Sequence, residues 1–379
     1  MAFTIGALKV HFILQEIVPL PYFIEPLTLA IYKNPYRLVK TRRICYKLCV
    51  GSMFFHLYFS FVWLLWIQIG RPGNLRDLNE TFIYLIIFSL CAIATSAYFT
   101  LEKYQNHIEY QLTQRFKLIK PLESDYSLKS LIIITFSAIF LAFPVLTSFF
   151  PYAMDIDPVQ IVCLGLASKI NPQLSSDLYF NYSVKIIASF VYCATTCYGA
   201  GICLGILLFA IMDLEGMEKL SNRMIGYGNH ERFNSCLSRF RIVRIFIGKT
   251  NYIMQEFLGI LVMMGIFLAV SCGFGTLKMY GILPTVTYFA CPFIHLVCYS
   301  YNFIHVTLAA VTNRNGQKFV MVWKRKVVKK SEGKDLAGCA RIGYAIGPIT
   351  CVKHCTAFSI ADTILSWTVS AAMIQRNNV

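Results

Sequence analysis

The chain has 379 residues, of which 56% are hydrophobic, 15% aromatic and only 14% charged, and its mean hydropathy is +0.57. One water-soluble core cannot bury so much apolar side chain, so the composition excludes a soluble domain and predicts an integral membrane protein. The net charge of +16 does not indicate a nucleic-acid partner, because the basic residues gather in loops between long apolar stretches.

The N-terminal stretch from His11 to Tyr32 is apolar but is interrupted by prolines and acids. Proline removes a backbone donor and breaks helices, and a carboxylate in hydrocarbon is costly. We therefore expect this stretch to be interfacial or re-entrant, within a cytoplasmic N-terminal segment. The interrupting residues are Glu16, Pro19, Pro21, Glu25 and Pro26.

Seven later stretches are long and apolar enough to cross roughly 30 Å of hydrocarbon as helices of about 20 residues. In chain order, they are Tyr46–Ile69, Thr81–Leu101, Leu131–Tyr152, Val184–Met212, Phe257–Leu277, Ile282–Val311 and Thr356–Ile374. The predicted fold class is an all-α membrane protein with seven transmembrane helices. The expected divisions are the N-terminal segment 1–45, helices 1 to 6 at 46–311, a basic cytoplasmic loop and anchor at 312–355, and helix 7 with the C-terminus at 356–379.

The basic residues predict the orientation. Segments before helix 1 and between helices 2 and 3, 4 and 5, and 6 and 7 hold most of the 35 Lys and Arg residues. By the positive-inside rule, these segments and the N-terminus are cytoplasmic, and the C-terminus is extracellular. Membrane lipids are expected partners, because the anionic inner leaflet attracts the basic run from Trp323 to Lys330.

The outer loops carry two N-glycosylation sequons. They begin at Asn79 and Asn181, both at the membrane edge, and their position agrees with the orientation. The inner connection Asp213–Glu256 mixes acids and bases at helical spacing. This pattern predicts that the membrane helices extend into the cytoplasm, and a solvated charged face is its plainest role.

No motif for an enzyme, a cofactor or a metal stands out. HExxH, GxSxG, Walker A and GxGxxG are absent, and the short CVKHC cluster at Cys351–Cys355 offers too few ligands for a metal site. We expect no enzyme activity, no cofactor and no metal. His56, His295 and His305 sit singly on apolar helices and are expected to be satisfied or packing histidines.

The last predicted helix carries a carboxylate and a face of small and polar residues. Asp362 is either a pore-side or ligand-side polar group or an interfacial residue capped by Thr363. The helical rule i, i+3, i+4 places four residues on one face that could line water: Leu365, Thr368, Ala372 and Gln375.

Aromatic residues gather at the predicted outer ends of the helices. Most are expected to form the interfacial aromatic belt, and the alternative is an apolar pocket between helices for a small organic ligand. Four residues at suitable depth are the pocket candidates: Tyr84, Phe149, Tyr192 and Tyr288.

The topology and the last forty residues resemble the arthropod gustatory and odorant receptor superfamily. That family ends in Thr-Tyr, five mostly apolar residues and Gln; here Thr368-Val369, Ser370 to Ile374 and Gln375 keep the spacing, with Val369 in place of Tyr. Upstream, the segment from Ala340 to Thr368 is similar to the Gly-containing approach to the last helix, especially in springtails and other non-insect arthropods.

The resemblance implies a chemosensory receptor that acts as a ligand-gated, non-selective cation channel in the plasma membrane of sensory neurons. Such channels are tetramers, homomeric or mixed, opened by a small tastant or odorant held between helices 2, 3, 4 and 6. Helix 7 lines the pore. Gln375 would face it, and Ala372 would lie near the hydrophobic gate. Because Ala372 is smaller than the usual gate residue and Arg376 adds positive charge at the outer mouth, we expect weakened cation conductance.

Two alternative classes of function remain. A seven-helix G-protein-coupled receptor requires an extracellular N-terminus and typically carries DRY and NPxxY motifs, which the sequence lacks. A membrane transporter or a membrane-embedded lipid enzyme requires several convergent ionisable residues at mid-membrane depth, and the sequence offers little beyond Asp362.

Overall fold

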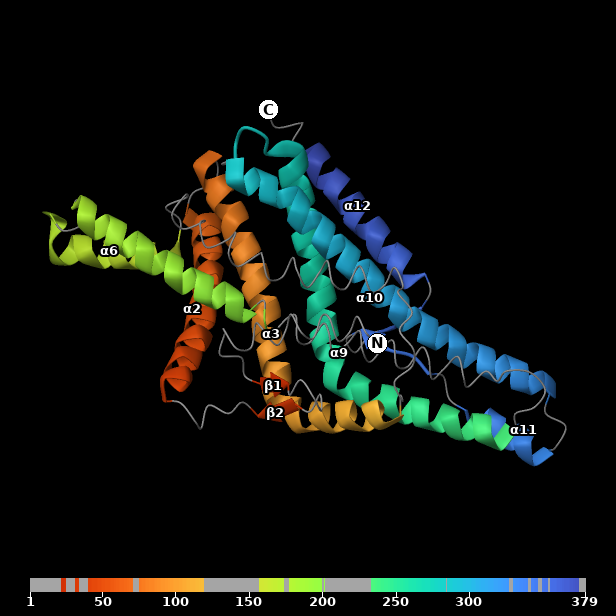
Figure 1. Ribbon diagram of the computed structural model, residues 1–379. Coiled ribbons are helices and arrows are strands. Elements are labelled where there is room, and N and C mark those ends of the chain that lie inside the picture. The colour runs from red at the N-terminus through yellow and green to blue at the C-terminus, as the bar shows by residue number, and fades with distance from the viewer. Residues whose placement is uncertain are drawn as a thin grey trace. The chain divides into compact units, whose positions relative to one another are not determined.

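The structure is a computed structural model in which helices predominate (Figure 1). Several predicted features lie outside the described residues, among them helix Leu131–Tyr152, Phe149, Gln375 and Arg376. The structure describes residues 22–24, 31–33, 40–70, 75–118, 157–173, 177–199, 201, 233–283, 285–326, 330–339, 342–346, 350–353 and 355–374.

Six of the seven predicted membrane stretches coincide with helices in the described residues. The fourth stretch is described up to residue 199, in a helix over residues 178–199, and at residue 201. The other five are in α2 (Lys40–Gly70), α3 (Leu75–Leu118), α9 (Phe233–Lys278), α10 (Thr285–Lys326) and α12 (Thr356–Ile374).

Four helices in the described part of the chain are long and apolar enough to cross a membrane. Their apolar spans are Tyr46–Ile67, Glu80–Tyr104, Phe233–Lys278 and Tyr288–Arg325. The predicted bounds of α12 are confirmed, whereas α3, α9 and α10 are much longer than predicted, with 44, 46 and 42 residues. The apolar run in the sequence ends where the helix leaves the hydrocarbon. The helix itself continues into water, where its charged side chains are hydrated. Since α9 begins at Phe233, the expected helical extension before the apolar run is confirmed there, while its cytoplasmic location stays a prediction.

Short elements complete the described chain. Helix α6 (Pro158–Ile170) ends at Asn171, whose backbone is extended, and helix α11 (Lys330–Ala337) precedes a turn at Gly338. Strands β1 (Tyr22–Ile24) and β2 (Ile31–Lys33) pair antiparallel, and so do β3 (Ala345–Ile346) and β4 (Thr350–Cys351). The described parts of the proline-rich N-terminal stretch are therefore extended rather than helical, as proline favours.

The chain divides into two compact units. Unit 1 comprises Met1–Glu102, Glu123–Ile206 and Ser271–Phe293, and unit 2 comprises Lys103–Leu122, Leu207–Val270 and Ile294–Val379. Helices α3, α9 and α10 each contribute one segment to both units. In unit 1, the Cβ of Ala94 lies 3.2 Å from the position that a Cβ on Gly199 would take, so α3 and the helix over residues 178–199 approach closely.

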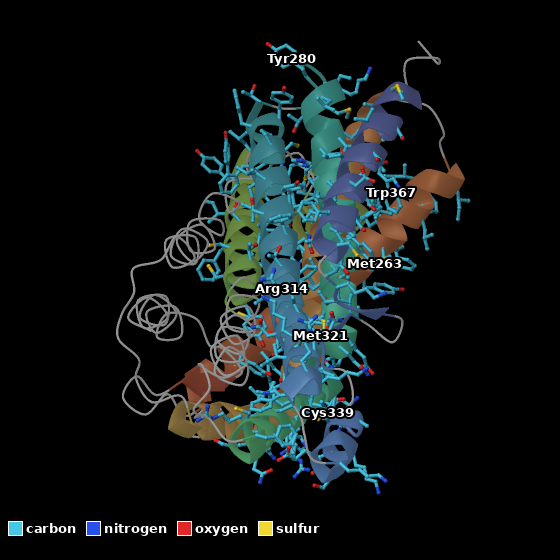
Figure 2. All side chains as sticks on the ribbon, turned by 90° about the vertical axis from the view of Figure 1, so that its right-hand side faces the viewer. Met263, Tyr280, Arg314, Met321, Cys339 and Trp367 are labelled. Atoms are coloured by element: carbon cyan, nitrogen blue, oxygen red, sulfur yellow. The ribbon has the colours of Figure 1, made fainter. Side chains whose placement is uncertain are left out.

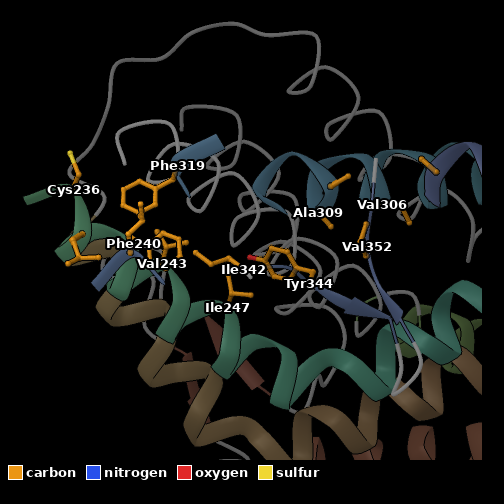
Figure 3. Packing of buried hydrophobic residues seen from close by; sticks show 14 of the residues in the cluster. Cys236, Phe240, Val243, Ile247, Val306, Ala309, Phe319, Ile342, Tyr344 and Val352 are labelled. Atoms are coloured by element: carbon orange, nitrogen blue, oxygen red, sulfur yellow. The ribbon is translucent and has the colours of Figure 1, made fainter. Parts of the chain in front are cut away.

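Unit 2 has its own hydrophobic core, shown in Figure 3. Phe240 of α9 and Phe319 of α10 are fully buried and stack with ring centroids 4.7 Å apart. Ile342 and Tyr344, from the chain that leads to α12, belong to the same core and extend it away from this pair. The connections predicted to be cytoplasmic therefore have a buried apolar side as well as charged residues. The high share of charged residues makes this apolar side hard to recognise in the sequence.

Candidate functional site

A buried aromatic cluster in unit 1 brings together side chains from four helices. Tyr84 of α3 is fully buried, with its ring 5.7 Å from that of Trp63 of α2. Phe59 stacks on Trp63 at 5.5 Å. Ile161 of α6 and Tyr192 of the helix over residues 178–199 pack against the same core. Aromatic side chains that converge in this way are typical of the walls of a small-molecule site.

A buried His–Asp pair borders this aromatic cluster. The ring of His56 lies 5.7 Å from the ring of Tyr192, and its Nε2 lies 3.8 Å from Oδ2 of Asp157. Both side chains are only 1% exposed. Two ionisable groups are rarely buried together without a structural or functional role, because each loses its hydration.

Helix α2 fixes the orientation of the imidazole. Nδ1 of His56 lies 2.8 Å from the carbonyl oxygen of Ser52, and because a carbonyl only accepts, Nδ1 carries the hydrogen. The Ser52 hydroxyl in turn accepts from the hydroxyl of Thr195 at 2.6 Å, which ties α2 to the helix over residues 178–199. Nε2 therefore faces the carboxylate and donates toward it only when the ring is doubly protonated.

Asp157 is held by the start of α6. Its Oδ1 accepts from the backbone N–H groups of Val159 and Gln160 at 2.8 and 3.2 Å, so it is the N-cap of the helix. The partial positive charge of the helix N-terminus stabilises the carboxylate. Among the described residues, Oδ2 has no hydrogen-bond partner and neither has Nε2 of His56, so two polar atoms face each other unsatisfied.

Two of the four predicted pocket residues lie together in the structure. Tyr84 and Tyr192 belong to the aromatic cluster, whereas Phe149 lies outside the described residues. Tyr288 packs at the turn between α9 and α10, where its hydroxyl donates to the carbonyl of Thr276 at 3.1 Å and its ring contacts Tyr280. These contacts close the turn.

Sequence reasoning missed both members of the His–Asp pair. His56 had been expected to be a satisfied or packing histidine, and its Nδ1 is satisfied while its Nε2 is not. Asp157 was overlooked, although Asp157-Pro158 has the form of an N-cap followed by a first-turn proline, a recognisable helix start. His295 is satisfied as expected, with Nδ1 2.7 Å from the carbonyl oxygen of Ala269.

The residues predicted to form the pore face of α12 are partly exposed and partly buried. Leu365 is 53% exposed, whereas Thr368 and Ala372 are buried together with Ile364. The Thr368 hydroxyl donates to the carbonyl of Ile364 at 2.7 Å, so the same helix satisfies it. The exposed side also carries Trp367, which projects outward in Figure 2.

A row at helical spacing runs along the exposed side of α12. It consists of Phe358, Asp362, Leu365, Val369 and Met373. Asp362 lies in the second turn of the helix, and the hydroxyl of Thr363 donates to the carbonyl of Ser359 at 2.8 Å. The expected sequon residues Asn79 and Asn181 lie in the first turns of α3 and of the helix over residues 178–199.

Two asparagines fasten the chain that precedes α12. The Asn251 side chain of α9 donates to the carbonyl of Gly343 at 2.9 Å and accepts from the N–H of Ala345 at 3.0 Å. Asn313 of α10 donates to the carbonyl of Val352 at 2.8 Å. Unit 2 therefore holds both strands of the β3–β4 hairpin, which positions the start of α12.

Comparison with known proteins finds no family model that matches and no significant match among curated proteins. Among solved structures, the insect olfactory receptor OR5 from Machilis hrabei matches with a TM-score of 0.61, covering 97% of both chains at 12% identity. The chain has the fold of an insect olfactory receptor. The complex of OR5 with eugenol matches as well, with a TM-score of 0.60 at 11% identity over 97% of this chain and 98% of that one.

This olfactory-receptor fold confirms the predicted class, an all-α membrane protein. It also bears out the resemblance seen in the last forty residues, at the level of the fold. The sides of the membrane on which the two termini lie stay predictions, as do the four divisions of the chain.

Proposed function

We propose that the chain is a chemosensory receptor of the arthropod gustatory and odorant receptor superfamily, and that it acts as a ligand-gated, non-selective cation channel. The observation that carries this proposal is the similarity of its fold to insect olfactory receptor OR5 over 97% of both chains. The shared fold favours this function over the G-protein-coupled receptor and the transporter.

The proposed ligand is a small organic molecule, an odorant or a tastant. Tyr84 and Tyr192 in the aromatic cluster support it, since they combine apolar faces with polar tips. The eugenol bound by OR5 is a small phenol, a size and polarity that would suit such a site. Phe149 and Tyr288 complete the proposed set from other parts of the chain.

The proposed pore is formed by α12 from four copies of the chain or of related receptors. The exposed row on α12 supports this, because such apolar side chains need either lipid or a neighbouring helix to cover them. We place the N-terminus in the cytoplasm, the C-terminus outside, and the protein in the plasma membrane of sensory neurons.

Gating follows from differential affinity. A ligand opens the channel only if it binds the open state more tightly than the closed one. The β3–β4 hairpin supports a mechanical link, because Asn251 and Asn313 hold the chain that enters α12. Movements of α9 and α10 would then reach the pore helix directly.

The test is electrical recording from oocytes that express the chain alone or with another receptor of the superfamily. A panel of odorants and tastants that includes eugenol should evoke a cation current in at least one combination. Surface biotinylation supplies the control for delivery to the membrane. Absence of current from cells that carry the chain at their surface would contradict the channel function.

Sidedness is a second test. Tags on the two termini, stained before and after permeabilisation, should show a protected N-terminus and an accessible C-terminus. The reverse result would reject the proposed orientation and restore the G-protein-coupled alternative.

A further inference from the structure

Unit 2 contains a cavity of about 700 Å³ between the last described turns of α3 and the first turns of α9. Its size is that of a site for a small molecule or for part of a lipid. It shares no residue with the aromatic cluster or with α12. The residues that line it are His107, Arg241, Arg244, Ile245, Gly248, Lys249, Tyr252 and Ile253.

Three of the residues that line the cavity are cationic. The side chains from α9 recur at spacings of three and four residues, so they share one face of the helix, and His107 faces them from α3. Arg241, Arg244 and Lys249 supply three full positive charges. Among the described residues, no acidic side chain lines the cavity. An anion is therefore favoured there.

Within the described part of the chain, Asp335 forms an ion pair with a residue of this face from outside the cavity lining. Asp335 of α11 lies 3.6 Å from the guanidinium of Arg241, and both side chains are at least half exposed. Exposed pairs of this kind contribute little, so Asp335 leaves most of the positive potential in place. No ion pair to Arg244 occurs within the described residues.

The rest of the lining is apolar. Ile245, Ile253 and the ring of Tyr252 contribute hydrocarbon surface, and Gly248 leaves open space where a side chain would stand. A free inorganic anion would leave this surface uncovered. A phosphate with an attached hydrocarbon chain would cover it. A cavity lining with both cationic and apolar residues therefore suits an amphiphilic ligand.

The position along α9 agrees with a lipid ligand. The uncharged apolar run predicted to cross the membrane begins at Phe257, so Lys249 precedes it by about two turns, or roughly 12 Å at 1.5 Å per residue. Headgroups occupy the zone next to the hydrocarbon, and basic pockets beside membrane helices are suited to phosphorylated headgroups.

We propose that this cavity binds a phosphate-bearing anion, with the headgroup of an anionic phospholipid as its source. The guanidinium of Arg244 and the ammonium of Lys249 contact the phosphate oxygens. Ile245, Tyr252 and Ile253 cover the first carbons of the lipid. The receptor fold would thus bind a lipid through residues other than those of the aromatic cluster.

The experiment measures binding of fluorescent short-chain phosphatidylinositol bisphosphate to the purified full chain in phosphatidylcholine nanodiscs. Replacing Arg244→Ala and Lys249→Ala together should weaken binding by about five-fold for each charge removed. The matched control is the pair Lys324→Ala and Arg325→Ala, two exposed cations of α10 outside the cavity lining, which should bind nearly as the wild type.

A second variant removes the space and keeps the charge. Gly248→Leu fills the cavity, and no atom lies within 4 Å of the added Cβ, so the helix is expected to remain intact. It should reduce binding as much as the loss of the two charges. Gly165→Leu on α6, which also meets open space, is the control and should have no effect.

Competition identifies the source of the phosphate. The lipid proposal expects unlabelled short-chain lipid to displace the probe, with soluble inositol trisphosphate much weaker. Equal displacement by the soluble compound would assign the site to a soluble anion and overturn the lipid as its source. Wild-type affinity in both the double charge variant and Gly248→Leu would overturn the site itself.

Discussion

At the scale of single residues, the His56–Asp157 pair is the least expected feature of unit 1. Asp157 serves two partners, because one carboxylate oxygen caps α6 and the other faces His56. With Nδ1 of His56 committed to the Ser52 carbonyl, a stabilising contact requires one proton shared between Nε2 of His56 and Oδ2 of Asp157. We expect this buried contact to join α2 to α6.

Asp157→Ala removes the N-cap of α6 and the buried partner of Nε2 of His56, so it should lower the free energy of unfolding by about 2–5 kcal/mol. Asp177→Ala is the matched control, because Asp177 accepts from the N–H of Tyr179 at 2.9 Å as an exposed helix cap. It should cost only about 0.5–2 kcal/mol. Denaturant titration of purified protein in detergent measures both, and equal losses would mean that His56 adds nothing.

At the scale of elements, two glycines of α9, Gly275 and Gly248, differ in the space that is available for a side chain. A Cβ on Gly275 would lie 2.7 Å from the ring of Phe82 and 3.2 Å from the sulfur of Cys291. Both neighbours are buried and cannot retreat freely. Gly248 meets open space. One glycine is required for close packing in unit 1, and the other leaves a cavity in unit 2.

Gly248→Ala should stabilise the chain by about 0.8–1 kcal/mol, since alanine is the better helix former. Gly275→Ala gains the same propensity but overpacks the interface, which typically costs about 1–3 kcal/mol, so the net effect is a loss. Thermal unfolding followed by tryptophan fluorescence compares the two variants. A gain at Gly275 would show that Phe82 moves aside without cost.

Helix α12 presents two sides that chemical labelling can distinguish. In a background with Cys355→Ser, which removes an exposed thiol, Leu365→Cys should react with a charged thiol reagent several times faster than Thr368→Cys. Leu365 is half exposed, whereas Thr368 is buried. Current inhibition measures the rate in oocytes. Faster reaction at position 368 would place the pore on the opposite side of the helix.

At the scale of the whole molecule, the four apolar residues of the exposed row on α12 support the proposed assembly, because they need lipid or a neighbouring helix to cover them. A channel needs several copies to surround a pore, and the proposed number is four. Native mass spectrometry of the purified chain should therefore show a particle of four times 43.2 kDa. A monomer that persists at high concentration in mild detergent, and conducts when reconstituted, would contradict the proposed assembly.

The sequence alone determined the class of the molecule and which of the described stretches form its long apolar helices. Long apolar runs can only be accommodated in a bilayer, and the backbone inside it must be helical to satisfy its hydrogen bonds. For this reason the bounds of α12 were predicted correctly from Thr356 to Ile374. The resemblance to arthropod chemosensory receptors rested on spacing in the same segment, and the fold agrees with it.

The tertiary structure alone decided which residues meet. Tyr84 and Tyr192 lie in one cluster, whereas Tyr288 does not. The predicted depth of a residue in the membrane does not determine which neighbouring helix its side chain faces. The His56–Asp157 pair and the cationic cavity each join residues far apart in the chain. Their chemistry arises from packing between helices, which hydropathy and charge counts do not encode.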